Sequence, residues 1–228
     1  MLGVTRSLQE RFGPEIAGMA AVGGASAGTF GGLLLAAGVD ARRLHEDAHL
    51  DLVQAVARAG GPLFRCNERV YATFLAYLDA AAPDAHERAS GRFHVSLSRV
   101  TARGVIATSK SEFADNADLV DAMIASAFVP VAYTSRPPLI FHRGRRDGRY
   151  YVDASVQDPR PTPLDEKTHP RLLLHHRMFR RDLPAFAPIS CDAAVVEDRF
   201  QMGYADAEDH AGELTAAFPP GGYPGGAP

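Results

Sequence analysis

The sequence predicts an α/β fold, in which helices cover both faces of a sheet. The first observation is an alternation along the chain. Short apolar runs typical of buried strands are followed by segments whose apolar residues recur every three or four positions, as on one face of a helix. The second observation is composition. The 228 residues are 46% hydrophobic and 22% charged, which is typical of a globular protein long enough to bury a core.

The N-terminal part of the chain contains three of these elements. In residues 2–12 the apolar side chains are four apart until Gly13, so we predict a helix there. Residues 16–22 form a short apolar run that predicts a buried strand. Residues 27–37 predict a second helix, which the chain enters through a turn.

Two further helices are predicted before the middle of the chain. Asp40 is a candidate N-cap for a helix whose apolar residues are spaced four apart until Gly60-Gly61 ends the pattern. The face that this spacing predicts to be apolar carries Leu44, Ala48, Leu52 and Val56. Residues 67–80 repeat the same spacing and predict a helix of similar character.

The middle of the chain contains an alternation of apolar and polar residues within 92–100, from Phe93 to Ser98, which predicts a strand. Residues 103–109 are predicted to pair with it. Helical spacing returns over 117–128 and is broken by Pro130. Residues 149–153 predict a short strand that leads into a polar turn.

Bulk properties limit the class of protein. One domain is predicted over residues 1–217, followed by a Pro/Gly-rich tail, 218–228, that cannot form a core and is predicted to be disordered. The net charge of −3 does not indicate a polyanionic partner, so no nucleic acid is expected. Cys66 and Cys191 are too few for a disulfide scaffold and indicate a reduced, intracellular setting.

A long uncharged run, Ile16 to Val39, raises the alternative of a membrane span or a signal peptide. Gly24 and Gly28 even give the GxxxG spacing of packed membrane helices. However, seven of the 24 residues are glycine, and each glycine weakens a helix by about 1 kcal/mol relative to alanine. We therefore favour a strand, a sharp turn and a helix over a membrane span.

The sharp turn carries a G-x-S-x-G sequence, Gly24-Ala25-Ser26-Ala27-Gly28. A nucleophilic serine must stand clear of the backbone, and a tight strand-to-helix turn achieves this at the cost of strained dihedrals. We expect that a Cβ at either glycine would clash there. The Ala27 N–H is placed to donate to an oxyanion. The alternative is a turn of small residues that packs a helix tightly on a sheet.

A nucleophilic serine needs a base, and the residues leave two kinds open. One is a triad in the order Ser26, Asp153 and a histidine, with His169, His175, His176 and His210 as candidates. This interpretation is disfavoured because Ser26 lies too near the start to be preceded by several strands. His94, on the polar side of a predicted strand, is expected to be structural. His45 and His49 are four apart on a solvated helix face without an evident third ligand, so no metal site is predicted.

Six motifs follow one another in order along residues 3–210. They are GVTRSLQERFGPEI, VGGASAG, GRFHVSLSRV, DLVDAMIASAFVPVAY, GRYYVDASVQDPRP and FQMGYADAEDH. They include the elbow and the helix before it, the alternating strand and the segment around Asp153. Together these motifs resemble those of the patatin-like phospholipases, and within them the adiponutrin-like lipases.

This resemblance implies a three-layer α/β/α sandwich around a mostly parallel sheet. It also implies a catalytic pair rather than a triad, with Ser26 as the nucleophile and Asp153 as the base. The implied function is a serine hydrolase of acylglycerol or phospholipid esters that needs no cofactor or metal. The implied setting is cytoplasmic, at the surface of a membrane or lipid droplet. The alternative is a catalytically impaired protein that keeps the fold and binds lipid or a partner.

The sequence departs from the family pattern in two places. The family has a glycine-rich oxyanion loop upstream of the first helix, whereas this chain begins at Met1-Leu2-Gly3, so we expect it to be N-terminally incomplete relative to the family domain. The family also has glycine after the aspartate, where this chain has Ala154. If Ala154 had a positive φ, the cost would be about 1–2 kcal/mol.

Two basic segments are candidates for contact with anionic lipid headgroups. Residues 142–149 predict an exposed hairpin loop rich in arginine. Residues 171–181 could form an interfacial helix with leucines among arginines. A solvated turn and a basic outer face of the core are the alternatives.

Overall fold

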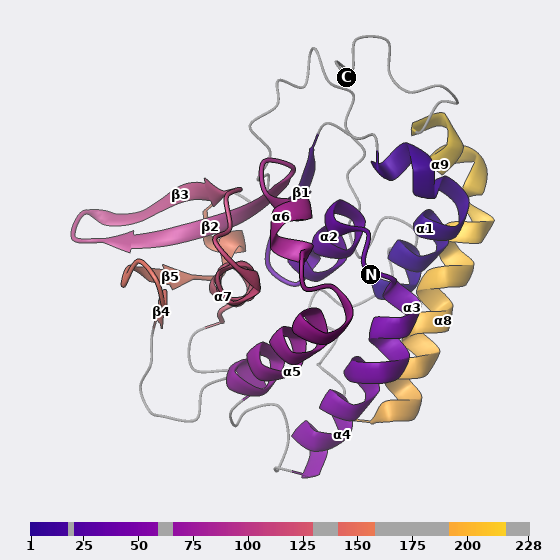
Figure 1. Cartoon of the computed structure of the whole chain (residues 1–228), viewed down its shortest axis with the longest axis horizontal. Helices are drawn as coiled ribbons and strands as arrows, with labels where there is room; N and C mark the ends of the chain where they lie inside the picture. The colour runs from indigo at the N-terminus through magenta and orange to yellow at the C-terminus, as the bar shows by residue number, and fades with distance from the viewer. Residues whose placement is uncertain (18–20, 59–65, 130–140, 158–191, 218–228) are drawn as a thin grey trace.

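The computed structural model describes residues 1–17, 21–58, 66–129, 141–157 and 192–217 (Figure 1). The predicted tail and the predicted interfacial helix lie outside these residues. The elements in chain order are α1 (Leu2–Ala17), β1 (Val22–Gly24), α2 (Gly28–Ala37), α3 (Ala41–Leu44), the π-helical segment η1 (His45–His49), α4 (Leu50–Arg58), α5 (Cys66–Ala81), α6 (Ala85–Ala89), β2 (Phe93–Thr101), β3 (Gly104–Lys110), α7 (Asn116–Ser126), β4 (His142–Arg143), β5 (Tyr150–Val152), the 3₁₀ turn η2 (Ala154–Val156), α8 (Ala193–Asp209) and α9 (Ala211–Ala217).

The first helix is longer than predicted. It continues to Ala17, with a kink at Phe12, where φ is −126° and ψ is 24°. The kink lies where the helix was predicted to end. Gly13 interrupts the apolar spacing there, but the helix continues through it. The strand predicted over residues 16–22 is therefore misplaced. The strand β1 begins at Val22 and continues to Gly24.

The uncharged run is divided between separate elements rather than forming one helix. Its described residues are divided among the end of α1, β1, α2, which is only ten residues long, and the turns beside them. In the part of the chain that the structure describes, no helix is long and apolar enough to cross a membrane. Most of α2 is buried, which explains why its sequence lacks charge.

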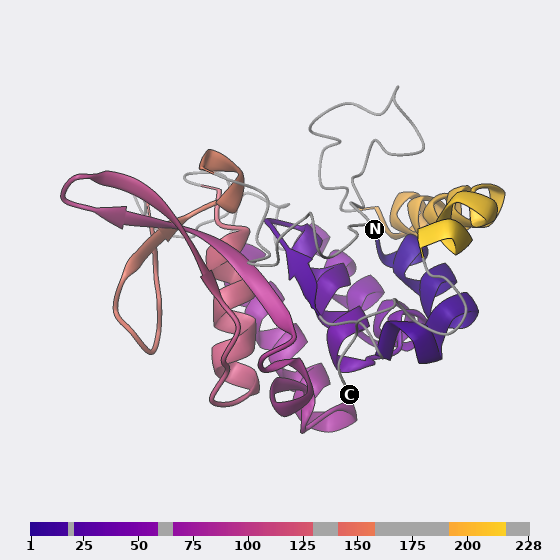
Figure 2. The ribbon, with the colours of Figure 1, turned by 90° about the horizontal axis from the view of Figure 1, so that it is seen from above.

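The sheet is organised around β2. On one edge β2 pairs with β3 in an antiparallel hairpin, from Val95 to Thr101. Its other edge pairs first with β1, in parallel, and then with β5, antiparallel. Because β1 and β5 run toward each other along this edge, the carboxyl end of β1, opposite Val95, and the carboxyl end of β5, opposite Ser98, converge. The hairpin of β2 and β3 extends away from the helices (Figure 2).

The predicted α/β class is confirmed, and the sheet is mixed. Among the described strands only β1 and β2 are parallel, whereas β3, β4 and β5 pair antiparallel. This differs from the mostly parallel sheet that the family resemblance implied. Short connections explain two of these antiparallel pairs, since two residues link β2 to β3 and six residues, 144–149, link β4 to β5.

Burial of β2 extends to both of its faces. The alternation predicted for residues 92–100 is present, and Phe93, Val95 and Leu97 belong to the core with α2 and α7. Ser96 and Ser98, on the opposite face, are also buried. The predicted polar side of this strand is thus not solvated at its centre.

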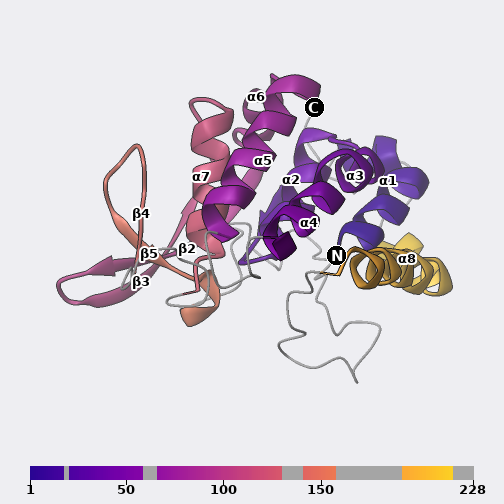
Figure 3. The same cartoon turned by 90° about the horizontal axis from the view of Figure 1, so that it is seen from below.

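The remaining helices follow the sequence closely. Asp40 caps α3, as predicted, by accepting hydrogen bonds from the N–H groups of Arg42 and Arg43. Together, α3, η1 and α4 cover the predicted span, and the predicted apolar face is buried. These three helical segments and the C-terminal α8 lie on the same side of the molecule as α1. The β2–β3 hairpin lies on the opposite side of α2 (Figure 3).

Candidate active site

The converging ends of β1 and β5 bring two polar side chains together. Ser26 follows β1 by two residues, and Asp153 follows β5 directly. The Ser26 Oγ donates a hydrogen bond to Oδ2 of Asp153 at 2.6 Å. These residues are 127 positions apart in the sequence, and their contact follows from the two strands that meet on the same edge of β2.

The backbone at Ser26 has a conformation that few residues adopt. Its φ is +50°, the only positive φ of a non-glycine residue in the described parts of the chain. Hydrogen bonds hold this turn on both sides. The Ser26 N–H donates to Oγ of Ser126 at 3.0 Å, and the Ser26 carbonyl accepts from the N–H and the Oγ1 hydroxyl of Thr29. The serine is thus held clear of the strand, as an elbow requires.

The two glycines of the elbow have different roles. A Cβ on Gly24 would lie 2.7 Å from the Thr29 Cα, so glycine is required where β1 passes under the turn. A Cβ on Gly28 would have no atom within 4 Å. The expectation of a clash at Gly28 is therefore wrong, because α2 leads away from β1 at that point.

The first turn of α2 carries a backbone donor beside Ser26. Ala27 is the N-cap of α2 and is exposed, and its N–H has no hydrogen-bond partner among the described residues. The next N–H, of Gly28, already donates to the Ala25 carbonyl at 2.9 Å. The N-terminal end of a helix also favours negative charge. Ala27 thus carries an N–H beside Ser26 that has no partner in the described part of the chain.

Asp153 is fixed by its backbone and by its second oxygen. The residue is 5% exposed, and the Asp153 N–H donates to the Phe128 carbonyl at 2.8 Å. The Oδ1 atom accepts from the N–H and the Oγ of Ser155 at 2.9 and 2.5 Å. Ala154 begins a 3₁₀ turn and has no positive φ, so the strain expected at this alanine is absent.

In the described residues, no histidine hydrogen-bonds to Ser26 or to Asp153. Nδ1 of His210 lies 2.8 Å from the Asp206 carbonyl on its own helix. Burial lowers the pKa of His94, which lies in the middle of β2. The other three candidates for a triad, His169, His175 and His176, fall outside the described residues.

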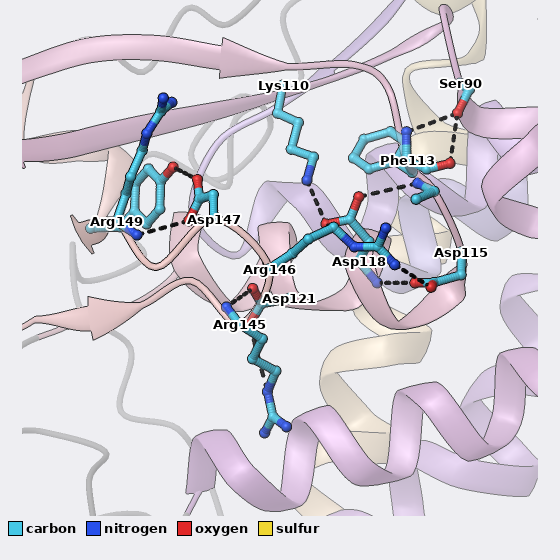
Figure 4. Close-up of polar contacts among 12 residues, drawn as sticks. Ser90, Lys110, Phe113, Asp115, Asp118, Asp121, Arg145, Arg146, Asp147 and Arg149 are labelled. Atoms are coloured by element: carbon cyan, nitrogen blue, oxygen red, sulfur yellow. Dashed lines mark hydrogen bonds and ion pairs between the residues drawn. The ribbon is translucent and has the colours of Figure 1, made fainter.

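The basic loop is an exposed hairpin turn, as predicted, and part of its charge is neutralised within the protein. Figure 4 shows Arg145 and Arg146 beside acidic residues of α7. Asp121 accepts a hydrogen bond from the Arg145 N–H at 2.8 Å and lies 2.9 Å from Nε2 of His142. Arg146 pairs with Asp115 at 2.6 Å. The sequence alone did not indicate these pairs, because the acidic residues and the loop are separated in the sequence. They lie together because α7 packs against β4 and β5.

The histidines at spacing four differ from the prediction of a solvated face. His45 is 1% exposed, its ring stacks on Phe200, and its Nε2 lies 2.8 Å from a carboxylate oxygen of Glu197. The Nδ1 atoms of His45 and His49 are 3.0 Å apart. No group of three possible ligands for a metal ion occurs among the described residues. The pair links η1 to α8.

A hollow of about 950 Å³ lies at the opposite end of α2 from Ser26. Its lining includes Leu35 to Gly38 and the arginines Arg6, Arg42, Arg88 and Arg92. Arg92 donates hydrogen bonds to the carbonyls of Ile16 and Ala36. The other three arginines form ion pairs. This hollow is separate from the candidate active site.

Comparison with known proteins places the chain in a family. The sequence model of the family described as "Patatin-like phospholipase" matches residues 1–165. The chain is 24% identical to a mouse omega-hydroxyceramide transacylase over 86% of its length and 35% of the relative. It is 30% identical to the mouse patatin-like phospholipase domain-containing protein 2 over 70% of its length and 31% of the relative. It is 38% identical to the mouse 1-acylglycerol-3-phosphate O-acyltransferase Pnpla3 over 40% of its length and 20% of the relative.

The chain thus spans about one third or less of the length of these relatives. The family match covers the elbow, the alternating strand and the segment around Asp153, which are motifs that carry the resemblance. The chain therefore belongs to the patatin-like phospholipase family.

Proposed function

We propose that this chain is a serine-dependent enzyme that acts on lipid esters, with Ser26 as the nucleophile and Asp153 as the base. The observation that carries the proposal is the 2.6 Å hydrogen bond between Ser26 Oγ and Asp153 Oδ2 at the converging ends of β1 and β5. A hydroxyl in direct contact with a carboxylate can lose its proton as it attacks a carbonyl carbon.

The proposed reaction has two steps. The Ser26 Oγ attacks the ester carbonyl carbon and its proton passes to Asp153 Oδ2. The bond to the leaving alcohol then breaks, and the alcohol oxygen takes that proton. In the second step water attacks the acyl-enzyme, Asp153 accepts a proton from the water, and the proton returns to Ser26 as the fatty acid leaves.

The negative charge that develops on the carbonyl oxygen needs donors. The Ala27 N–H at the start of α2 is one such donor, and the helix N-terminus adds a favourable field. Loss of a single oxyanion donor typically costs about 10²–10³ in rate. The rate of the chain therefore depends on the Ala27 donor and on any further donors that complete the site.

The relatives support the class of substrate that we propose. Their names describe a phospholipase domain protein, an acyltransferase and a transacylase, all of which fit the handling of a lipid acyl group. Acyl transfer and hydrolysis share the first step and differ in whether a hydroxyl of another lipid or water attacks the acyl-enzyme. We propose hydrolysis of acylglycerol or phospholipid esters as the basal activity of this chain, because water is always present as an acceptor.

The direct test is ester turnover with three variants. We expect Ser26→Ala to abolish turnover of a short-chain ester and Asp153→Asn to reduce it by about 10³-fold or more. Ser109→Ala is the matched control, because Ser109 is exposed on β3. Turnover that survives Ser26→Ala would refute the proposal. A wild-type chain that folds, binds lipid vesicles and turns over no ester would favour the alternative, a patatin-fold protein that only binds lipid or a partner.

A lipid-ester enzyme must meet its substrate at a surface, so we also propose peripheral contact with a membrane or lipid droplet. Exposed arginines support contact with anionic headgroups, because Arg103 and Arg143 form no ion pair with the described residues. Co-sedimentation with anionic and neutral vesicles tests this part. Equal binding to both kinds, or to neither, would contradict a contribution from these arginines.

A further inference from the structure

We infer that Ser126 and Ser155 are positioning residues for the proposed reaction, one for each member of the Ser26–Asp153 pair. The inference rests on the proposed function and extends it to side chains that the elbow sequence does not contain. Four residues form one hydrogen-bonded series. Ser126 accepts from the backbone of Ser26, Ser26 donates to Asp153, and Asp153 accepts from Ser155.

Ser126 supports the strained turn. It is fully buried at the end of α7, and its Oγ accepts the Ser26 N–H at 3.0 Å. A residue with a φ of +50° keeps that conformation only where its surroundings hold it. The Ser26 N–H lies before the first turn of α2, so no carbonyl of that helix is available to accept its hydrogen bond. The Ser126 hydroxyl accepts this hydrogen bond instead.

The same end of α7 also holds the other member of the pair. Two residues beyond Ser126, the Phe128 carbonyl accepts the Asp153 N–H at 2.8 Å. Consequently, one short segment of chain contacts the backbones of both Ser26 and Asp153. A shift of this segment would move the two reacting side chains together, whereas loss of the Ser126 hydroxyl would release only Ser26.

Ser155 fixes the rotation of the Asp153 carboxylate. The terminal torsion of an aspartate side chain has a broad range, so a carboxylate held by one hydrogen bond can turn away from its partner. Both donors of Ser155, the N–H and the Oγ, meet Oδ1, which leaves Oδ2 for Ser26. Ser155 is exposed, so its hydroxyl can be removed without leaving a cavity.

Four variants separate positioning from general stability. Ser126→Ala removes a buried hydroxyl, and Ser7→Ala is its matched control, because Ser7 is equally buried but bonds Glu208 in the contact of α1 with α8. Ser155→Ala removes an exposed hydroxyl, and Ser155→Thr restores one. Each variant is measured for kcat and KM with a soluble short-chain ester, for the rate of labelling by a fluorophosphonate, and for its thermal midpoint.

We expect Ser126→Ala to lower kcat and the labelling rate by about 10–100-fold with little change in KM, because misplacement of a nucleophile by about 1 Å has an effect of that size. We expect Ser155→Ala to lower kcat by about tenfold at an unchanged thermal midpoint, with recovery in Ser155→Thr. Ser7→Ala should lower the thermal midpoint without lowering kcat. Hydrogen exchange at the Ser26 amide should accelerate in Ser126→Ala and remain unchanged in Ser7→Ala.

Two kinds of failure are distinguishable. If the wild-type protein reacts at Ser26 and both Ser126→Ala and Ser155→Ala react at the wild-type rate, the positioning roles are refuted and the proposed function stands. If the wild-type protein does not react with ester or with the label, both proposals fall. Unchanged exchange at the Ser26 amide in Ser126→Ala would refute the role of Ser126 whatever the activity.

Discussion

Replacement of the first elbow glycine gives a prediction whose size follows from the coordinates. In Gly24→Ala the new Cβ would lie 2.7 Å from the Thr29 Cα and 3.2 Å from a ring carbon of Phe93. Ordinary contact begins near 3.4 Å, so the turn must move away from β1 by about 0.7 Å. The Cβ would also lie 3.2 Å from the Thr29 N. Because the two Thr29 atoms belong to the backbone, no side-chain rotation relieves the clash with Thr29.

This displacement acts on both stability and activity. Overpacking of this kind costs about 1–3 kcal/mol of the free energy of unfolding. The same shift would lengthen the 2.6 Å bond between Ser26 and Asp153 to about 3.3 Å, beyond the usual limit for a hydroxyl donor. We therefore expect kcat to fall by about 10–100-fold.

Gly28→Ala is the matched control for this prediction. It makes the same substitution in the same motif, where the Cβ meets nothing within 4 Å and the backbone is helical. We expect unchanged or slightly higher stability, because alanine is favoured over glycine in a helix by about 1 kcal/mol. Urea unfolding gives the stability, and the initial rate of fluorophosphonate labelling gives the reactivity. Equal damage by the two substitutions, or none by Gly24→Ala, would refute the reasoning.

Two further predictions concern polar contacts outside the Ser26–Asp153 pair. Asp121→Asn should lower the free energy of unfolding by about 2 kcal/mol in thermal or urea melts, because a carboxylate that faces His142 and the Arg145 N–H is replaced by a neutral amide; an unchanged midpoint would show that this contact adds no stability. Burial, and secondarily the neighbouring His45, lowers the pKa of His49 from 6.5 to about 4. As the pH falls, the imidazole of His49 is therefore protonated in the unfolded chain before it is protonated in the folded protein. The free energy of unfolding should be highest above about pH 7 and about 2 kcal/mol lower by pH 5. This loss should be complete below about pH 4. His49→Gln should lack this part of the pH dependence in urea melts, and an identical dependence in both proteins would contradict the assignment to His49.

The sequence predicted the elements that have regular apolar spacing and missed those that depend on contacts between distant segments. The helix over 67–80 and the strand over 92–100 have their predicted positions because their side-chain periods are unambiguous. The strand predicted at 16–22 was displaced toward Gly24, because a short run of alanine and glycine has no period that separates a helix from a strand. Residues 24–28 connect β1 to α2, which is the order of strand, turn and helix that the sequence predicted.

The candidate site was predictable only in part. Ser26 is identifiable from the glycines around it, and Asp153 from the family resemblance. The contact of Asp153 with Ser155 could not be read from the sequence, because it depends on how η2 turns after β5. Ser126 contacts Ser26 across 100 positions of sequence, so no local pattern could indicate it. Gly28 shows the reverse case, since the motif predicted a crowding that the path of α2 removes.

The most direct test of the central claim is the site of covalent labelling. The wild-type protein is treated with a fluorophosphonate and digested, and the modified peptide is identified by mass spectrometry. We predict a single adduct on Ser26 and a labelling rate that falls by about 10³-fold in Asp153→Asn. Ser155 is the informative competitor, because its hydroxyl also contacts Asp153, at 2.5 Å, but it has no helix N-terminus behind it. An adduct on Ser155, or none on a folded protein, would contradict the assignment of Ser26 as the nucleophile.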